Sequence, residues 1–164
     1  MKLGIIGSGM IVQDFLTTAD QIDNLELTAI SSTKRSAGIA QELAQKYNIS
    51  QTYTDNEKLM SDSNVDTVYI GVPNFLHYSL AKLALEHGKN VICEKPFVLS
   101  TAEAEELKRL ADEKDLIIVE AITNIYLENY KKIKEELDNI APIHIVSLNL
   151  SLIHISEPTR LALI

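Results

Sequence analysis

The chain has 164 residues, 46% of them apolar and 23% charged, which is the composition of an ordinary globular protein with one sizeable core. Its formal net charge of -8 argues against a nucleic acid or an anionic membrane as partner. The sequence shows no signal-peptide layout and no apolar stretch of membrane-spanning length, and the lone cysteine, Cys93, excludes an internal disulfide; we therefore expect a cytoplasmic protein.

The first expected element is a short strand over Lys2–Ile6, followed by a glycine turn and a helix over residues 10–22. A strand, glycine turn and helix in this order are typical of a dinucleotide site, although the turn alone could be a plain tight turn. Glycines let the backbone approach a pyrophosphate, and the helix start offers unpaired N–H groups. Val12 replaces the third glycine of the common pattern, which predicts looser helix–strand packing or a slightly shifted phosphate.

A second strand is expected over residues 25–31 and a second helix over residues 36–47. Dinucleotide sites that bind NAD usually carry an acidic residue at the end of this strand, where it bonds the ribose 2′-hydroxyl. This chain instead has hydroxyls and cations there, at Ser32, Thr33, Lys34 and Arg35. Such residues favour a 2′-phosphate, so the pattern favours NADP over NAD, or tolerance of both. The alternative is that Lys34 and Arg35 only form a solvated turn.

The rest of the chain continues the alternation of strands and helices. Asp55 is a candidate N-cap, Gly88 is a candidate helix stop, and Ser100 with Glu103 forms a candidate capping box. The pattern predicts an α/β fold with a doubly wound parallel sheet, a Rossmann fold. The further strands are expected at residues 51–53, 65–72, 91–93 and 116–121, and the further helices at residues 55–61, 75–87, 100–114 and 126–137.

The apolar run that begins at Val91 stops abruptly at Glu94-Lys95-Pro96. Proline cannot continue a strand, and it holds the residue before it in an extended conformation. Lys95 should therefore lie at the carboxyl edge of the sheet, where ligands bind in open α/β folds. A lysine there can donate a hydrogen bond or carry a proton, although it could also be an ordinary surface lysine. Cys93 is expected to be a buried packing residue.

Several separated motifs together resemble one family. They are Gly71-Val72-Pro73-Asn74, then His77, then Gly88-Lys89 before a strand, and Glu94-Lys95-Pro96 at its end. This set is similar to the Gfo/Idh/MocA family of nicotinamide-dependent oxidoreductases, the glucose–fructose oxidoreductase and inositol dehydrogenase type. The resemblance covers residues 2–120 and, more weakly, residues up to 149. The chain departs from the family at Ile125 and Glu128, where an arginine and a proline are common, so substrate contacts from that segment are in doubt.

The resemblance implies an enzyme that moves a hydride between NADP or NAD and a secondary alcohol or carbonyl of a sugar, polyol or related cyclic substrate. It implies that Lys95 bonds the reacting oxygen, that Glu94 fixes the cofactor or Lys95, and that His77 lines the pocket. The implied cofactor contacts are Gly7, Ser8, Gly9, Met10 and Ile11 at the pyrophosphate, Ser32, Thr33, Lys34 and Arg35 at the adenosine ribose, and Pro73, Asn74 and His77 beside the nicotinamide, with Glu94 and Lys95 also counted among them.

In this family a larger, mostly antiparallel α+β domain follows and supplies an Asp, a His and the usual homo-oligomer contacts. We expect residues 1–122 to form the nucleotide domain and residues 123–149 to form a linker helix and the first strand, near residues 143–148, of a truncated second domain. Residues 150–164 include an eleven-residue run, from Leu150 to Arg160, that resembles a translated sequencing adapter rather than natural protein. A genuine tail is the alternative, and in neither case are His154 and Glu157 read as a metal site.

Two other functions remain open at this point. The chain could be a dinucleotide-binding module without catalysis, acting as a redox sensor or a partner-binding subunit. It could also be an inactive, poorly soluble fragment, because the helix from Tyr126 and the strand after it would lack their packing partners.

Overall fold

A computed structural model of the chain describes residues 1–140 and residue 142. It divides into two units, Met1–Ile122 and a second unit that begins at Thr123. Each unit is described by itself below. The expected strand at residues 143–148 and the adapter-like tail lie outside the described residues.

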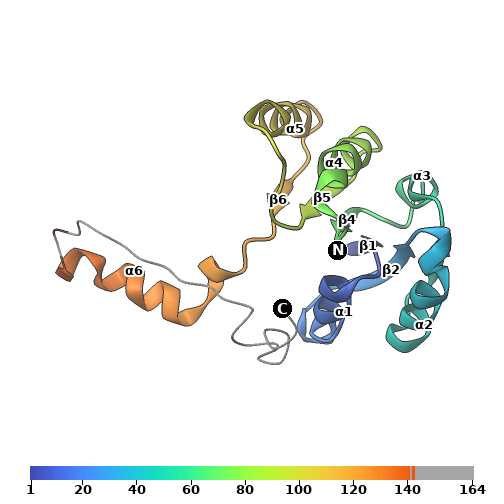
Figure 1. The fold of residues 1–164 in the computed structure, drawn as a ribbon, viewed down its shortest axis with the longest axis horizontal. Coiled ribbons are helices and arrows are strands. Elements are labelled where there is room, and N and C mark those ends of the chain that lie inside the picture. Colours follow the sequence, from blue (N-terminus) through green and yellow to red (C-terminus); the bar gives the residue numbers. More distant parts are fainter. Residues whose placement is uncertain (141, 143–164) are drawn as a thin grey trace, which may run out of the picture. The chain divides into compact units, whose positions relative to one another are not determined.

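The first unit is built on a six-stranded sheet in the order β3-β2-β1-β4-β5-β6, and every neighbouring pair of strands is parallel (Figure 1). This confirms the predicted α/β fold with a doubly wound sheet. From β1 the chain adds β2 and then β3 on one side, and afterwards adds β4, β5 and β6 on the other side. β1 therefore lies between β2 and β4, at the point where the direction of winding changes. The strands are β1 Lys2–Ile6, β2 Glu26–Ser31, β3 Gln51–Tyr53, β4 Thr67–Ile70, β5 Asn90–Cys93 and β6 Ile118–Glu120.

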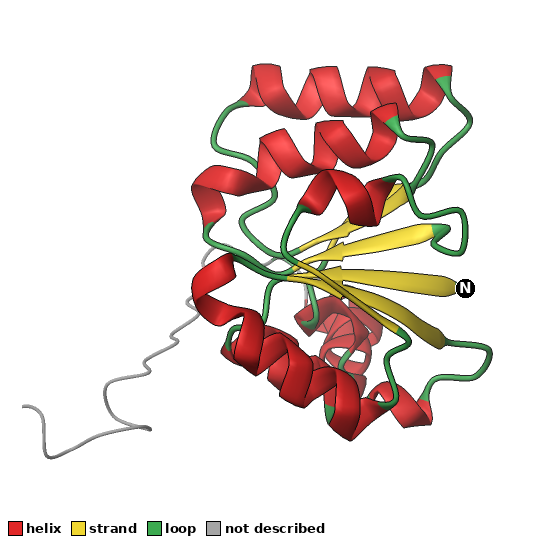
Figure 2. Cartoon of the chain, turned by 90° about the vertical axis from the view of Figure 1, so that its right-hand side faces the viewer, coloured by secondary structure: helices red, strands yellow, loops and turns green. Residues whose placement is uncertain are grey.

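Helices cover both faces of this sheet (Figure 2). Residues in the strands alternate between the two faces, so Ile6 packs in the core cluster that includes Leu59 and Leu85, while Ile5 packs with Val12 and Leu43. The first cluster belongs to α3, α4 and α5, and the second to α1 and α2. These helices are α1 Met10–Leu16, α2 Ala37–Tyr47, α3 Asn56–Met60, α4 His77–Glu86 and α5 Thr101–Glu113.

Helix α1 is shorter than the apolar spacing predicts, because it ends at Leu16 instead of continuing to residue 22. The hydroxyls of Thr17 and Thr18 donate to the carbonyl oxygens of Asp14 and Phe15, at 2.7 and 3.0 Å. Threonine side chains that bond the backbone compete with helical hydrogen bonds, which explains the early end. A separate 3-10 turn, Ala19–Gln21, follows. The expected N-caps Asp55 and Ser100 are both confirmed, since each side chain accepts a hydrogen bond from its helix.

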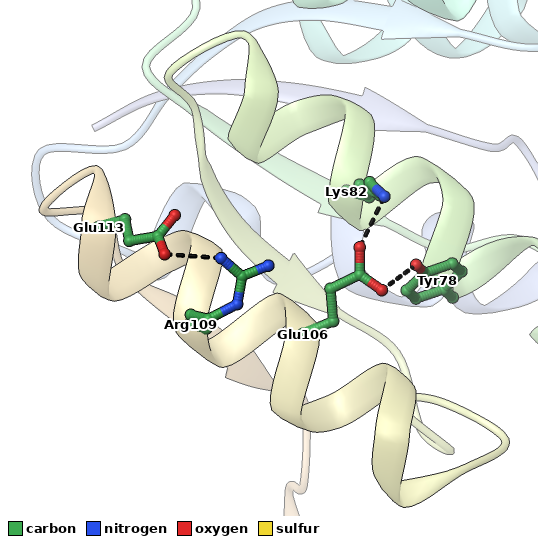
Figure 3. A network of polar contacts seen from close by, with 5 residues as sticks. All are labelled: Tyr78, Lys82, Glu106, Arg109 and Glu113. Carbon is green, nitrogen blue, oxygen red and sulfur yellow. Dashed lines mark hydrogen bonds and ion pairs between the residues drawn. The ribbon is translucent and has the colours of Figure 1, made fainter.

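Helices α4 and α5 are joined by a polar network on their outer side (Figure 3). One carboxylate, that of Glu106, accepts hydrogen bonds from the Tyr78 hydroxyl and from the Lys82 ammonium, both at 2.6 Å. These two bonds hold the pKa of Glu106 below its ordinary value. The network ties α5, which leads into edge strand β6, to the helix that precedes β5.

The second unit, as far as it is described, contains a 3-10 turn at Asn124–Tyr126 and helix α6, Glu128–Ile140. Tyr130, Ile133 and Leu137 are exposed and recur at helical spacing, so α6 is amphipathic. The helix predicted at residues 126–137 is thus present, with a start two residues later. Within the described part of the chain, no helix has both the length and the apolar character needed to cross a membrane.

Candidate functional site

A cleft of about 590 Å³ lies at the carboxyl edge of the sheet in the first unit. There the chain leaving β1 leads to a helix on one face of the sheet, and the chain leaving β4 leads to a helix on the other. In open α/β sheets this switch point is where ligands bind. None of the described residues that line it is charged. The lining comes from loops after four strands and from the helices next to them: Ile6, Gly7, Ser8, Gly9, Ile11, Ser31, Ser32, Thr33, Ser36, Ile39, Thr54, Asn56, Gly71, Val72, Pro73, Leu76 and Leu80.

Gly7 is required by the backbone geometry at the floor of this cleft. Its φ is +114°, and a Cβ built on it would lie 2.2 Å from the carbonyl oxygen of Gly71. Gly7 therefore lets the end of β1 pass directly beside the end of β4, and its N–H donates to the Ser31 carbonyl of β2 at 2.8 Å. Three strand ends thus meet at this residue.

Gly9 is the N-cap of α1, and no side chain caps the helix. A Cβ on Gly9 would meet no atom within 4 Å, so the space in front of the helix is open. The first N–H groups of a helix lack partners within it, and they are available here to an anionic ligand. Ser8, before Gly9, and Ile11, in the first turn of the helix, both line the cleft. The side chain of Met10 is 79% exposed and is not among the lining residues.

Val12 does not loosen the packing of α1, and that expectation was wrong. Its side chain is 0% exposed, and a Cβ on Gly71 would lie 2.6 Å from its Cγ2 atom. The close approach that a glycine in the helix would allow is provided by Gly71 at the end of β4 instead. In the common pattern the glycine of this contact is on the helix. Here the helix carries the valine and the strand end carries the glycine, and the contact remains tight.

The end of the cleft beyond β2 and β3 is lined by hydroxyl and amide groups. Ser32 and Thr33, the expected ribose contacts, lie on its wall together with Ser36. The Ser31 hydroxyl donates to Oδ1 of Asn56 at 2.7 Å, which leaves the Asn56 NH₂ group free to donate elsewhere. Thr54 and Asn56 were missed by the sequence reasoning. The signal that could have found them is their position directly after β3, since the carboxyl ends of parallel strands share one edge.

Lys34 and Arg35 do not line the cleft. Both are exposed and belong to the 3-10 turn Lys34–Ser36, which follows Thr33 directly. Their position at the rim leaves the cleft wall neutral and places two positive charges next to its hydroxyl-lined end.

The opposite end of the cleft is lined after β4 by Val72 and by Pro73, which was expected beside the nicotinamide. Asn74 is exposed and starts the 3-10 turn Asn74–Leu76, which leads into α4. His77 has a different environment from the one expected. Its side chain is 0% exposed and is not among the lining residues; its Nδ1 lies 2.8 Å from the Pro96 carbonyl and its Nε2 lies 2.9 Å from the Val72 carbonyl.

Lys95 follows β5 on the same edge of the sheet as the glycine turn, because all six strands run in parallel. Its side chain is exposed and is not among the cleft-lining residues. β5 is two strands from β1, a spacing of about 10 Å in a sheet. The Lys95–Pro96 peptide bond is cis.

Buried and partly buried polar groups surround the Lys95 turn. Glu94 is buried and its carboxylate accepts from the Tyr69 hydroxyl at 3.0 Å and from the Lys95 N–H at 3.3 Å. On the other side, the Phe97 N–H donates to the Glu120 carboxylate at 2.8 Å. The structure therefore brings Glu94 to Lys95, and it adds Tyr69 and Glu120, which the sequence did not suggest.

Burial and the Glu94 charge raise the pKa of Tyr69, so this hydroxyl stays protonated and can only donate to the carboxylate. Burial, with the charges of Glu94 and Glu120, raises the pKa of Cys93 to about 12. The Cys93 thiol is therefore unreactive near neutral pH, which confirms its prediction as a packing residue.

Comparisons with known proteins agree with this geometry. Residues 1–122 match a family model described as GFO_IDH_MocA, oxidoreductase family, NAD-binding Rossmann fold. The chain is 37% identical over 143 residues to scyllo-inositol 2-dehydrogenase (NADP(+)) IolU of Bacillus subtilis, covering 87% of this chain and 43% of that protein. It is 34% identical over 147 residues to D-xylose 1-dehydrogenase (NADP(+)) of Hypocrea jecorina, covering 82% of this chain and 37% of that protein.

Among solved structures, the 3-ketoreductase KijD10 of Actinomadura kijaniata, in complex with NADP and TDP-benzene, matches with a TM-score of 0.79 and 26% identity. The match covers 85% of this chain and 42% of that one. The chain thus spans less than half the length of these relatives. Because the family model matches most of the chain and the cleft lies at the switch point of the sheet, the chain belongs to the Gfo/Idh/MocA family of oxidoreductases with an NAD-binding Rossmann fold.

Proposed function

We propose that this chain is the cofactor-binding region of an oxidoreductase that transfers a hydride between NADP or NAD and a secondary alcohol or carbonyl. The observation that carries the proposal is the neutral cleft at the β1–β4 switch point, with the glycine turn at its floor and Lys95 on the same edge of the sheet. A nicotinamide dinucleotide lying along this edge would extend from the β2 end of the cleft toward β5.

The pyrophosphate would lie against the open start of α1, contacted by backbone atoms of Gly7, Ser8, Gly9, Met10 and Ile11. The absence of an N-cap side chain and the free space at Gly9 support this placement. Because the wall is neutral, the negative charge of the ligand must be met by backbone N–H groups and hydroxyls.

The adenosine ribose would be bound by Ser32 and Thr33 on the wall and by Lys34 and Arg35 at the rim. No carboxylate lines this end of the cleft among the described residues, and a carboxylate is what would repel a 2′-phosphate. We therefore propose a preference for NADP over NAD. The two enzymes compared above are both named as NADP(+) dehydrogenases, which supports this preference.

The nicotinamide would lie near Pro73 and Asn74, with Lys95 directed at the reacting oxygen of the substrate. The cofactor carries the hydride when bound, and the chain's own residues orient it and supply the hydrogen bond. Glu94 would fix the turn that carries Lys95, which its contacts with Tyr69 and the Lys95 N–H support. A sugar or polyol substrate is supported by the names of the inositol and xylose dehydrogenases.

Residues 1–122 would form the nucleotide domain, and residues 123–149 would lead into the second domain that the family resemblance implies. Hydride transfer requires the substrate carbon and the nicotinamide to be held in contact, usually with water kept out. The described residues supply one wall of such a site. We therefore expect this chain by itself to bind the dinucleotide without measurable turnover.

The proposal is tested by Lys95→Met in a protein of the relatives' length that contains this region. Loss of a donor at the reacting oxygen should lower kcat by about 100-fold or more, since acid–base groups contribute on that scale. The Kd for NADPH should stay within about twofold, because methionine keeps the length of the side chain and the cofactor contacts lie elsewhere. Unchanged turnover would remove Lys95 from the mechanism.

A further inference from the structure

The loops that would flank the nicotinamide are linked by a side chain rather than by backbone. The β4–β5 ladder ends at Ile70 and Cys93, and its last hydrogen bond runs from the Glu94 N–H to the Ile70 carbonyl, at 3.0 Å. Beyond it, within the described residues, no backbone hydrogen bond joins residues 71–74 to residues 95–97. The two loops nevertheless need a fixed separation if both are to act on one ring.

The imidazole of His77 spans this gap. One ring nitrogen lies 2.9 Å from the Val72 carbonyl, in the loop that lines the cleft. The other lies 2.8 Å from the carbonyl of Pro96, the residue after Lys95. The His77 side chain is 0% exposed, so water does not compete for the ring nitrogens.

The geometry of an imidazole suits this bridging role. Its two N–H directions point to nearly opposite sides of a rigid ring, so one side chain can reach two carbonyls that face each other. A protonated ring donates to both carbonyls and a neutral ring donates to one. A ring that donates at both nitrogens sets the spacing between the two carbonyl groups, because the rigid ring cannot change its length.

We propose that His77 is a positioning residue for the nicotinamide side of the cleft: it fixes the Val72–Pro73 loop against the Lys95–Pro96 turn and does not touch the cofactor itself. This inference rests on the proposed function of the cleft and names how its two loops are held in register. It separates the nicotinamide end, which depends on His77, from the adenosine end beyond β2, which does not.

The test compares the whole dinucleotide with its adenosine half. The affinities for NADPH and for 2′,5′-ADP are measured on the unsubstituted chain and on His77→Gln. If the chain binds NADH more tightly than NADPH, the ligands are NADH and ADP instead. A glutamine carries both donors on one nitrogen, so it can keep one of the two contacts at most. We expect NADPH affinity to fall by about tenfold, the effect of about one lost hydrogen bond. Affinity for 2′,5′-ADP should stay within about twofold.

His87→Gln is the matched control. His87 also has a ring nitrogen 2.9 Å from a carbonyl, that of Leu83, but it lies at the other end of α4, away from the carboxyl edge of the sheet. It should change neither affinity. Equal weakening of both ligands by His77→Gln, or no weakening of NADPH, would overturn the inference, as would an effect of His87→Gln on NADPH as large as that of His77→Gln.

A measurement without a substitution covers the case in which His77→Gln fails to fold. The ¹⁵N signals of the His77 ring in the unsubstituted chain should shift on addition of NADPH and stay in place on addition of 2′,5′-ADP. Shifts of equal size with both ligands would contradict the proposal. If the unsubstituted chain binds neither ligand, the proposed function fails and this inference fails with it. If the chain binds NADPH and His77→Gln leaves that affinity unchanged, only this inference is overturned.

Discussion

The two halves of the carboxyl edge are built in different ways. At the ends of β1, β2 and β4 the cleft is lined by small residues: Gly7, Gly9 and Gly71 leave the backbone open to a ligand, and Ser31 and Ser32 add hydroxyls. At the ends of β5 and β6 the edge is organised by polar side chains: the buried Glu94 is bound to Tyr69, and the partly buried Glu120 is bound to the Phe97 N–H.

This difference separates two tasks. Backbone N–H groups and hydroxyls can hold a phosphate or a ribose without any charged residue on the wall. The role proposed for the Lys95 ammonium requires a rigid turn, and the hydrogen bonds that Glu94 and Glu120 accept from the backbone of that turn hold it in place. Substitutions in the first half should therefore act on backbone approach and binding, and substitutions in the second half should act on the stability and position of the Lys95 turn.

The largest effect on the fold is expected from Gly7→Ala. The added Cβ would lie 2.2 Å from the Gly71 carbonyl oxygen, and alanine is strained at a φ of +114°. We expect the free energy of unfolding to fall by about 3 kcal/mol or more, measured by urea denaturation. Gly38→Ala is the control, because a Cβ there meets no atom within 4 Å and the residue lies in α2, where alanine is favoured. A loss of less than about 1 kcal/mol in Gly7→Ala would show that the β1 and β4 ends do not approach as described.

A smaller effect is expected from Tyr69→Phe in the second half. It removes a hydrogen bond to the buried Glu94 carboxylate and should lower the free energy of unfolding by about 2 kcal/mol at pH 7. The pKa of Tyr69 is raised in the folded chain, so its contribution is present below pH 10, the ordinary tyrosine value, and is lost as the pH rises above it. The difference between the two proteins should therefore shrink in alkaline solution.

Tyr53→Phe serves as the matched control for that change. The Tyr53 hydroxyl also donates to a carboxylate, that of Asp62, at 3.1 Å, but Tyr53 is less buried and lies far along the sheet from the Lys95 turn. Its loss should cost under about 1 kcal/mol. If both tyrosines proved equally important, the distinction drawn here between the two halves would lose its support.

The parts predictable from sequence were those set by local chemistry. Strand positions followed from short apolar runs, and the glycine turn and the N-caps Asp55 and Ser100 followed from residue type. The wall residues Ser32 and Thr33 followed from their place after β2. Helix α1 ended early because threonine hydroxyls competed with its backbone bonds, a balance that periodicity does not reveal.

The parts that were missed depend on residues distant in the sequence. His77 has a partner 19 positions away, and Tyr69 has one 25 positions away. Gly71 takes the place of a glycine in α1 only because β4 lies beside β1. Such pairings depend on the tertiary fold, so a single sequence did not suggest the partners of His77 or the role of Tyr69, and the expectation that His77 lines the pocket came from the family resemblance.

The most direct test of the account is a fluorescence titration of this chain with NADPH and NADH, with Gly9→Ala beside it. A Cβ on Gly9 meets no protein atom, so the free energy of unfolding should change by less than about 1 kcal/mol, while the methyl group enters the space proposed for the pyrophosphate. We predict saturable binding at one site, tighter for NADPH, and a loss of affinity of about tenfold or more in Gly9→Ala. No saturable binding of either dinucleotide, or equal affinity in Gly9→Ala, would contradict the account.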